Sequence, residues 1–438
     1  MHHKVAAAEG IRGIACFMVI FSHLSLSFFP YLHSFGSYRA PPYALELAIH
    51  HSPFGFFYSG TAAVYIFFVL SGYVLTYSIV NSQQPRTKIK SMTLKRLPRL
   101  MLPALGSCVL LWLAFYSMQP DGQYVSAWLD ALGSEVTGSA SLSSLADALY
   151  DGVVRTFWYG WSQYNWVLWT MKFELVGSLL IFALLYVHYA LPQRSNDAVV
   201  KSPSLLAPLW RPVFMLFLLI GLLLLSYISL RMTPFDSNSL TEWSALDILE
   251  NMLEIVAFLL GMLLFFYYQV LSELMNDWLA FTLLALGLYC AGVHDSSVCY
   301  RWLNPWLDGR TYNLLNFIAG PFIVSAVLMN TRLARLFSTS IPVYLGRISF
   351  AAYLNHLLII YVVGLPLFNL LHQWQVSYAI SALLSCTAVI GVTIAFSEVY
   401  YRVVDQNTLR FSAWLAHVLI RPKSTEATEA TQKKPAYK

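Results

Sequence analysis

A histidine lies inside the first long apolar stretch of the sequence, RGIACFMVIFSHLSLSFF. His23 follows Ile11 by twelve residues, which in a helix corresponds to about 18 Å along the axis. An imidazole at that depth in apolar surroundings is expected to be uncharged and able to accept a proton from a substrate hydroxyl. The alternative is a histidine that only hydrogen-bonds a neighbouring helix.

Two arginines three residues apart precede the third apolar stretch, in KRLPRLMLP. If this segment is helical, Arg96 and Arg99 share one face and could together hold phosphate groups, such as those at the nucleotide end of a coenzyme. Arg12, at the start of the first stretch, could serve the same purpose. Anchoring to lipid headgroups is the alternative role for these arginines.

Polar side chains also lie within later apolar stretches, where each needs a partner because water is absent. Glu174 and Lys172 are two residues apart and so point to different faces of a helix, which predicts that each finds its partner elsewhere. Glu174 is expected either to form an ion pair between helices or to orient a catalytic histidine or a substrate. Asn355 and His356 form a further intramembrane polar site.

The elements that carry these residues are expected to be transmembrane helices. Apolar residues make up 58% of the 438 positions and charged residues only 11%, whereas soluble domains carry roughly 25% charge. The apolar spans, most of which reach the ~20 residues of a membrane-crossing helix, cover residues 11–30, 58–80, 100–118, 166–190, 212–230, 251–271, 278–292, 312–330, 349–369 and 377–400. The predicted fold is an all-α, polytopic transmembrane bundle of about ten helices, with 278–292 as a short member.

The Lys and Arg residues are distributed unevenly around these spans. With the N-terminus inside, 21 of the 27 fall on inner segments and five on outer segments. Because positive charge is enriched on the cytoplasmic side, both termini are predicted to be cytoplasmic. The net charge of +5 then reflects topology and anionic headgroups, and nucleic-acid binding is not expected. Residues 1–410 are expected to form one transmembrane domain, and residues 411–438 a cytoplasmic, disordered tail.

The cysteines do not indicate a metal site. The five of them have no metal-ligand spacing. Cys290 and Cys299 flank the outer end of the seventh span and could form a disulfide, although packing is the other possible role. We therefore predict neither a metal nor a resident cofactor.

Five segments, taken in order, form a series: RGIACFMVIFSH, FFVLSGY, KRLPRLMLP, WTMKFE and LGRISFAAYLNH. They resemble the successive signatures of the acyltransferase 3 family of integral membrane O-acyltransferases, and they extend from residue 10 to about 400. Each segment alone is a weak signal, but five in the family's order are specific. Met171, Tyr65 and Pro98 depart from the family's pattern, which affects substrate and fine geometry more than the reaction.

The resemblance implies a ten-helix enzyme that moves an acetyl or another short acyl group from cytosolic acyl-CoA to a hydroxyl of a carbohydrate, lipid or small metabolite. It implies that His23 is catalytic, and the uncharged imidazole expected at that depth would act as the general base. It gives the coenzyme role to Arg96 and Arg99, with Arg12 matching the arginine of the opening motif. Glu174 matches the acid of the family's W-[ST]-L-x-x-E stretch. Acyl-CoA would be a co-substrate, and the bilayer the permanent partner.

Two other functions stay open at the level of the sequence. A secondary transporter also carries titratable groups at membrane depth, although no paired halves with matching Gly or Pro breaks are visible. A second class of membrane O-acyltransferase uses a histidine deep in a late span, for which Asn355 and His356 would be the candidates. The acceptor is not selected, because the Trp and Tyr residues between 158 and 166 suit a stacked sugar or an ordinary interfacial belt.

Overall fold

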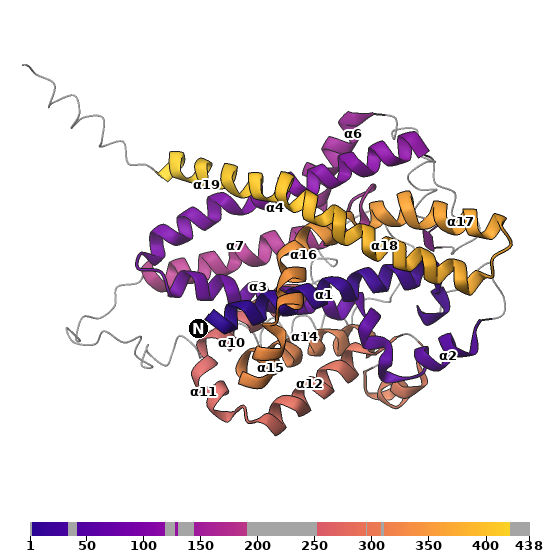
Figure 1. The fold of residues 1–438 in the computed structure, drawn as a ribbon. Coiled ribbons are helices and arrows are strands. Elements are labelled where there is room, and N and C mark those ends of the chain that lie inside the picture. Colours follow the sequence, from indigo (N-terminus) through magenta and orange to yellow (C-terminus); the bar gives the residue numbers. More distant parts are fainter. Residues whose placement is uncertain are drawn as a thin grey trace, which may run out of the picture.

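The structure is a computed structural model that describes residues 2–33, 42–118, 128–129, 144–190, 252–294, 296–307 and 311–420. In this part of the chain the regular elements are helices, and none is a strand. Seven helical runs are long and apolar enough to cross a bilayer, or eight if one bent pair counts as a span. The predicted all-α, multi-pass membrane protein is confirmed, and Figure 1 shows its long helices gathered into one bundle.

Seven of the predicted spans coincide with these membrane-length runs. The N-terminal half contributes α1 (His2–Phe28), α3 (Gly60–Val80), α4 (Pro85–Met118) and α7 (Trp169–Ala190). The C-terminal half contributes α14 (Thr311–Met329), then α16 (Ser340–Ile359) continued by η7 (Ile360–Gly364) and α17 (Leu365–Gln373), then α18 (Tyr378–Tyr400) continued by η8 (Tyr401–Asp405) and α19 (Gln406–Ile420).

The remaining predicted spans differ from simple crossings. Span 251–271 corresponds to α10 (Met252–Phe266) and α11 (Tyr268–Leu274), which meet at a bend of 76°. Span 278–292 corresponds to α12 (Asp277–Ala291), which is as short as predicted. Span 212–230 lies outside the described residues. The total of ten helices and the cytoplasmic placement of both termini therefore stay predictions.

Shorter helical segments join the long ones. They are η1 (Pro30–His33), α2 (Ala44–His50), η2 (Pro53–Tyr58), α6 (Leu145–Tyr150), η4 (Asp151–Tyr159), η5 (Trp166–Leu168), η6 (Val298–Leu303), α13 (Asn304–Leu307) and α15 (Thr331–Phe337). Most of them belong to segments predicted to lie on the outer side.

The contact between α1 and α16 is the most extensive in the bundle. Cys16 Sγ donates to the carbonyl oxygen of Ser349 at 3.2 Å, and the two residues are 333 positions apart. Gly13 and Gly346 meet with the same separation, and a Cβ on Gly13 would lie 2.5 Å from the backbone nitrogen of Gly346. The absence of side chains at both glycines lets the two backbones touch. The constant separation shows that α1 and α16 run parallel in a fixed register.

Two features of the remaining helices bear on the predictions. α4 continues through Pro98 and Pro103, so Arg96 and Arg99 lie on one uninterrupted helix. α19 remains helical to Ile420, past the domain boundary predicted at residue 410. α19 packs against α4, and this contact keeps the amphipathic helix ordered beyond the last predicted span. Residues 421–438 lie outside the described part. In Figure 1 the start of α1 and the end of α19 point to the same end of the bundle.

Candidate active site

His23 on α1 and His356 on α16 face each other inside the bundle. Nδ1 of His23 lies 2.7 Å from Nε2 of His356. The ring planes are within 8° of parallel and the ring centroids are 4.9 Å apart, so the two rings meet edge to edge. His356 is fully buried, whereas His23 is partly exposed. The structure thus joins, in one site, two histidines that the sequence presents as rival candidates.

The hydrogen-bond partners assign the protons on both rings. Nδ1 of His356 lies 3.2 Å from the carbonyl oxygen of Ala352, which can only accept, so this nitrogen carries the proton. Nε2 of an uncharged His356 then accepts a hydrogen bond from Nδ1–H of His23. A neutral His23 is left with an unprotonated Nε2, for which the described residues provide no hydrogen-bond partner. That nitrogen is free to act as a base.

The segment of α16 before His356 is fixed to its neighbours at two points. The hydroxyl of Tyr353 donates to the carbonyl oxygen of Val167 at 2.8 Å. Nδ2 of Asn165 donates to the carbonyl oxygen of Leu354 at 2.9 Å. Tyr353 and Asn165 are both buried, so these bonds are shielded from water and hold the imidazole of His356 in place.

An aromatic side chain covers the other side of the pair. The rings of Trp128 and His23 are within 8° of parallel, with centroids 5.5 Å apart. Trp128 lies between the predicted spans 100–118 and 166–190. A single tryptophan outside a periodic element gives no sequence signal for such a contact.

A buried ion pair lies between α4 and α7. Nη2 of Arg96 bonds to Oε1 of Glu174, and Nε of Arg96 donates to Oγ of Ser178 at 2.8 Å. Ser71 on α3 donates to the same carboxylate oxygen at 2.8 Å. The prediction that Glu174 and Lys172 find separate partners is confirmed, since Lys172 donates to a backbone carbonyl outside α7. The structure therefore brings Glu174 to Arg96 and does not bond it to either of the two histidines.

Arg99 has different surroundings from Arg96. Its side chain is exposed, and it forms no hydrogen bond or ion pair with another described residue. The charged groups that act on it are Arg96, Arg12, Asp405 and Glu174, which come from four different elements. Asp405 is buried. The guanidiniums of Arg12 and Arg96 lie near that of Arg99, but Arg12 is paired with Glu9 at 3.1 Å and Arg96 with Glu174. Arg99 therefore has its donors free for an anion.

The other predicted polar groups form bonds of their own, although Oδ1 of Asn355 is buried without a hydrogen-bond partner among the described residues. Nδ2 of Asn355 donates to the carbonyl oxygen of Ala351 at 2.8 Å, so its amide is directed along α16. Cys290 and Cys299 are not bonded to each other, and Sγ of Cys299 donates to the carbonyl oxygen of His51 at 2.8 Å. Among the described residues no group of His, Cys, Asp and Glu could hold a metal ion.

Three more histidines gather between η1, α2 and the segment after α12: His33, His50 and His294, called here the outer histidine cluster. Nδ1 of His50 and Nδ1 of His294 lie 2.8 and 3.2 Å from backbone carbonyl oxygens, and Nε2 of His33 lies 2.7 Å from a serine hydroxyl. The rings of His33 and His294 meet edge to face at 4.9 Å. Burial lowers the pKa of His294 to about 4 and also lowers the pKa of His33.

Of the buried acids that were not singled out from the sequence, Glu254 and Asp405 lie in or just after predicted spans. Glu254 on α10 is buried, and its Oε2 has no hydrogen-bond partner among the described residues. The rule that identifies Glu174 applies equally to Glu254, which lies in the predicted span 251–271. Asp405 follows the last predicted span, so its sequence position gives no sign that it is buried next to Arg99.

Comparisons with known proteins match this chain over nearly its whole length. A family profile described as an acyltransferase domain matches residues 5–398. The chain is also similar to the O-acetyltransferase PaAT-1 of Phomopsis amygdali, with 25% identity over 456 residues that cover 96% of this chain and 86% of that protein. No solved structure matches the chain. The matched range includes both histidines of the site and the converging arginines of α1 and α4.

Proposed function

Because the chain belongs to the acyltransferase 3 family, we propose that it transfers a short acyl group, such as acetyl, from cytosolic acyl-CoA to a hydroxyl group, with His23 as the general base. Family membership and the membrane bundle support the reaction class. The role of His23 rests on one observation. Its Nδ1 meets Nε2 of His356, and this contact leaves the other nitrogen of His23 unprotonated.

In the proposed mechanism Nε2 of His23 takes the proton of the acceptor hydroxyl while the hydroxyl oxygen attacks the thioester carbonyl carbon. The carbon–sulfur bond of the tetrahedral intermediate then breaks, and the leaving thiolate takes the proton from His23. One ester and one free thiol form, and His23 returns to its neutral state. While His23 is protonated, the hydrogen bond from its Nδ1–H to His356 becomes charge-assisted and stabilises the imidazolium.

The arginines of α1 and α4 are proposed to bind the phosphates of acyl-CoA. Arg99 suits this role best, because the residue is exposed and no carboxylate bonds to it in the described part of the chain. Arg96 adds positive charge from within the bundle, where Glu174 and Ser178 hold it in place. We therefore assign Glu174 a positioning role, through Arg96, rather than direct contact with substrate.

The unprotonated Nε2 also suits a second mechanism, in which His23 attacks the thioester and carries the acyl group before passing it to the acceptor. The two mechanisms differ when acceptor is absent. A covalent mechanism releases one thiol per protein and leaves a labelled His23, whereas general-base catalysis releases thiol only with acceptor present.

The proposal is tested with purified protein in liposomes, labelled acetyl-CoA and a metabolite extract from a deletion strain as the pool of acceptors. We expect protein-dependent thiol release and a labelled ester, whose mass identifies the acceptor. Profiling of the deletion strain should show the same compound lacking one acyl group. Uptake of a labelled compound into the liposomes without thiol release would contradict the proposal and favour a transporter.

A further inference from the structure

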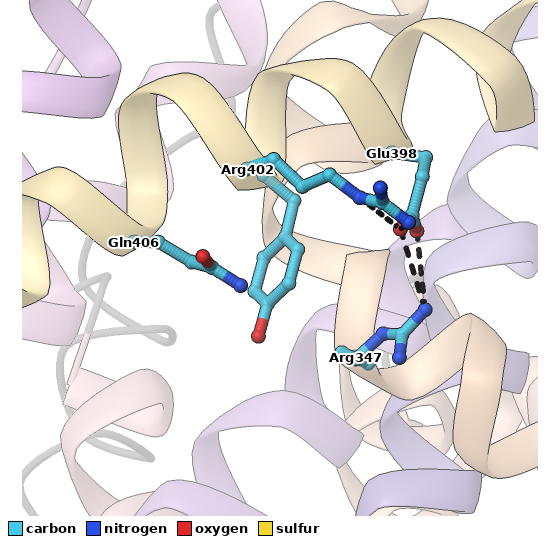
Figure 2. A pocket seen from close by; sticks show the side chains of 5 residues that line it. Arg347, Glu398, Arg402 and Gln406 are labelled. Atoms are coloured by element: carbon cyan, nitrogen blue, oxygen red, sulfur yellow. Dashed lines mark hydrogen bonds and ion pairs between the residues drawn. The ribbon is translucent and has the colours of Figure 1, made fainter.

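A pocket of about 340 Å³ lies between the first part of α16 and the segment where α18 passes into α19. It is lined by Arg347, Glu398, Tyr401, Arg402 and Gln406. Figure 2 shows these side chains converging from α16 on one side and from α18, η8 and α19 on the other. None of these residues takes part in the proposed proton transfer.

The pocket has an excess of positive charge. Oε2 of Glu398 accepts a hydrogen bond from Nη2 of Arg347 at 3.2 Å, and Oε1 accepts one from Nε of Arg402 at 2.7 Å. In Figure 2 the carboxylate lies between the two guanidiniums. The arginine side chains are 48% and 69% exposed, and that of Glu398 is 19% exposed. One carboxylate cannot use all the N–H donors of two arginines, so donors remain for an anion that enters the pocket.

Aromatic rings lie beside these charges. The guanidinium carbon of Arg347 is 5.0 Å from the ring centre of Tyr344 and 5.8 Å from that of Tyr401. Flat aromatic faces next to arginines suit a ligand that combines a planar ring with a phosphate, because the ring can stack while the guanidiniums hold the phosphate. A nucleotide has both parts.

The elements that line the pocket also approach the arginines of α1 and α4. Asp405 lies three residues after Arg402, and its charged neighbours are Arg99 and Arg12. On the other side, Gly346 precedes Arg347 and packs directly against the backbone of α1, one turn before Arg12. The elements that carry Arg347 and Arg402 therefore lie next to those that carry Arg12 and Arg99.

Along α16, the pocket lies nearer to the N-terminal end of the helix than the histidine pair does. His356 follows Arg347 by nine residues, which corresponds to about 14 Å along the helix axis. An extended arm such as pantetheine could connect a nucleotide held in the pocket to a thioester near His23.

We propose that the Arg347–Glu398–Arg402 pocket binds the 3′-phosphate end of acyl-CoA, with the adenine ring against Tyr401. This inference rests on the proposed function and adds the site for the nucleotide end of the donor. A terminal phosphate carries close to two negative charges at neutral pH and so matches the surplus charge of the pocket. The diphosphate of the same molecule then lies nearer to Arg99. The phosphate of an anionic lipid has the same chemistry and is the competing occupant.

The test compares the binding of CoA and of 3′-dephospho-CoA to the full-length protein by titration calorimetry in nanodiscs of zwitterionic lipid. We expect wild-type protein to prefer CoA by about tenfold, the lower range for hydrogen bonds to a charged group. Arg402→Gln should remove this preference. Glu398→Gln, which frees both guanidiniums, should keep or increase it.

The control is Arg410→Gln, an exposed arginine on α19 that does not line the pocket. It should keep the wild-type preference, and equal melting temperatures of the variants exclude a folding defect. The inference is overturned if wild-type protein binds both compounds equally, or if Arg402→Gln keeps the preference. The titrations are repeated in nanodiscs that contain anionic lipid. The inference is also overturned if Arg402→Gln changes the binding of both compounds equally and only in these nanodiscs, because that result identifies a lipid site. Because binding does not require turnover, these results are independent of the thiol-release assay of the proposed function.

Discussion

The His23–His356 pair and the outer histidine cluster use the same residue type in opposite ways. In the pair, the rings bond to each other, and one nitrogen of His23 is left without a partner in the described part of the chain. In the cluster, His50 and His294 bond to backbone carbonyls, His33 bonds to a hydroxyl, and the rings of His33 and His294 pack edge to face.

The difference shows that burial alone does not identify a catalytic histidine. His294 is more buried than His23, yet its Nδ1 is held by the carbonyl oxygen of Gly292, its own near neighbour in sequence. A histidine that fixes loops needs its nitrogens satisfied by fixed groups. A histidine that moves a proton needs one nitrogen oriented and the other free.

The largest expected effect is the loss of the base. His23→Gln should lower the rate of acyl transfer by about 1,000-fold, within the range that general-base catalysis contributes. His294→Gln, in the outer histidine cluster, should lower it less than about threefold, because His294 takes no part in the proposed proton transfer. Thiol release under saturating acetyl-CoA measures both. Equal losses in the two variants would remove the distinction between the regions.

The second test concerns the ion pair of Arg96 and Glu174. Its loss should affect the stability of the protein rather than the chemical step. Glu174→Gln leaves Arg96 charged and buried without its carboxylate, which is expected to cost about 3 to 5 kcal/mol of stability. Glu273→Gln, at an exposed carboxylate on α11, should cost less than about 0.5 kcal/mol. Thermal unfolding in nanodiscs compares the two. A Glu174→Gln protein of normal stability that lacks activity would instead make Glu174 catalytic.

The third test concerns the partner of His23. His356→Leu removes the acceptor for Nδ1–H and should lower the rate about 10- to 100-fold, as for a hydrogen bond to a charged group. His356→Gln offers a side-chain carbonyl as the acceptor and should recover part of this loss. If His356→Leu abolishes activity while His23→Gln retains it, the late-span histidine is the base and our assignment is reversed.

The smallest effect is expected in the outer histidine cluster and depends on pH. The pKa of His294 is lowered from 6.5 to about 4, so the unfolded chain binds more protons than the folded protein between these values. The stability from neutral His294 is therefore complete above about pH 6.5 and declines as the pH falls toward 4. His33, which faces His294 and is likewise neutral, reinforces this trend. Tyr58, His50 and Tyr312 also lie beside His294.

The wild-type protein should lose stability between about pH 7.5 and about pH 5.5. His294→Gln should make this loss smaller by about 1 kcal/mol. Thermal unfolding at these two pH values measures the change. If the wild-type protein and the variant lose the same stability, the titration of His294 does not contribute to this pH dependence.

Much of the fold can be predicted from the sequence, because the length of an apolar run is read directly from consecutive residues. The runs around His23, Glu174 and His356 lie in helices where hydropathy places them, and α12 is short as predicted. The bend between α10 and α11 and the helical extension to Ile420 depend on packing against other helices, which hydropathy does not report.

The sequence identifies the residues of the site but not which of them contact each other. His23, His356 and Glu174 each stand out as polar groups at membrane depth, and Arg96 stands out as one of two arginines before the third span. Which of them meet is decided by the register of α1 on α16 and of α4 on α7, and a register between distant segments cannot be read from either segment alone. The family's motifs indicate the reaction class, and the structure shows which residues contact each other.

The most direct test of the central claim is the protonation of the two site histidines. Nitrogen-15 chemical shifts of histidine side chains can be measured in labelled protein in nanodiscs near neutral pH and assigned with the His23→Gln and His356→Gln variants. Our account predicts that both rings are uncharged, with the proton on Nδ1 and an unprotonated Nε2 on His23. A His23 ring that carries its proton on Nε2, or on both nitrogens, would contradict it.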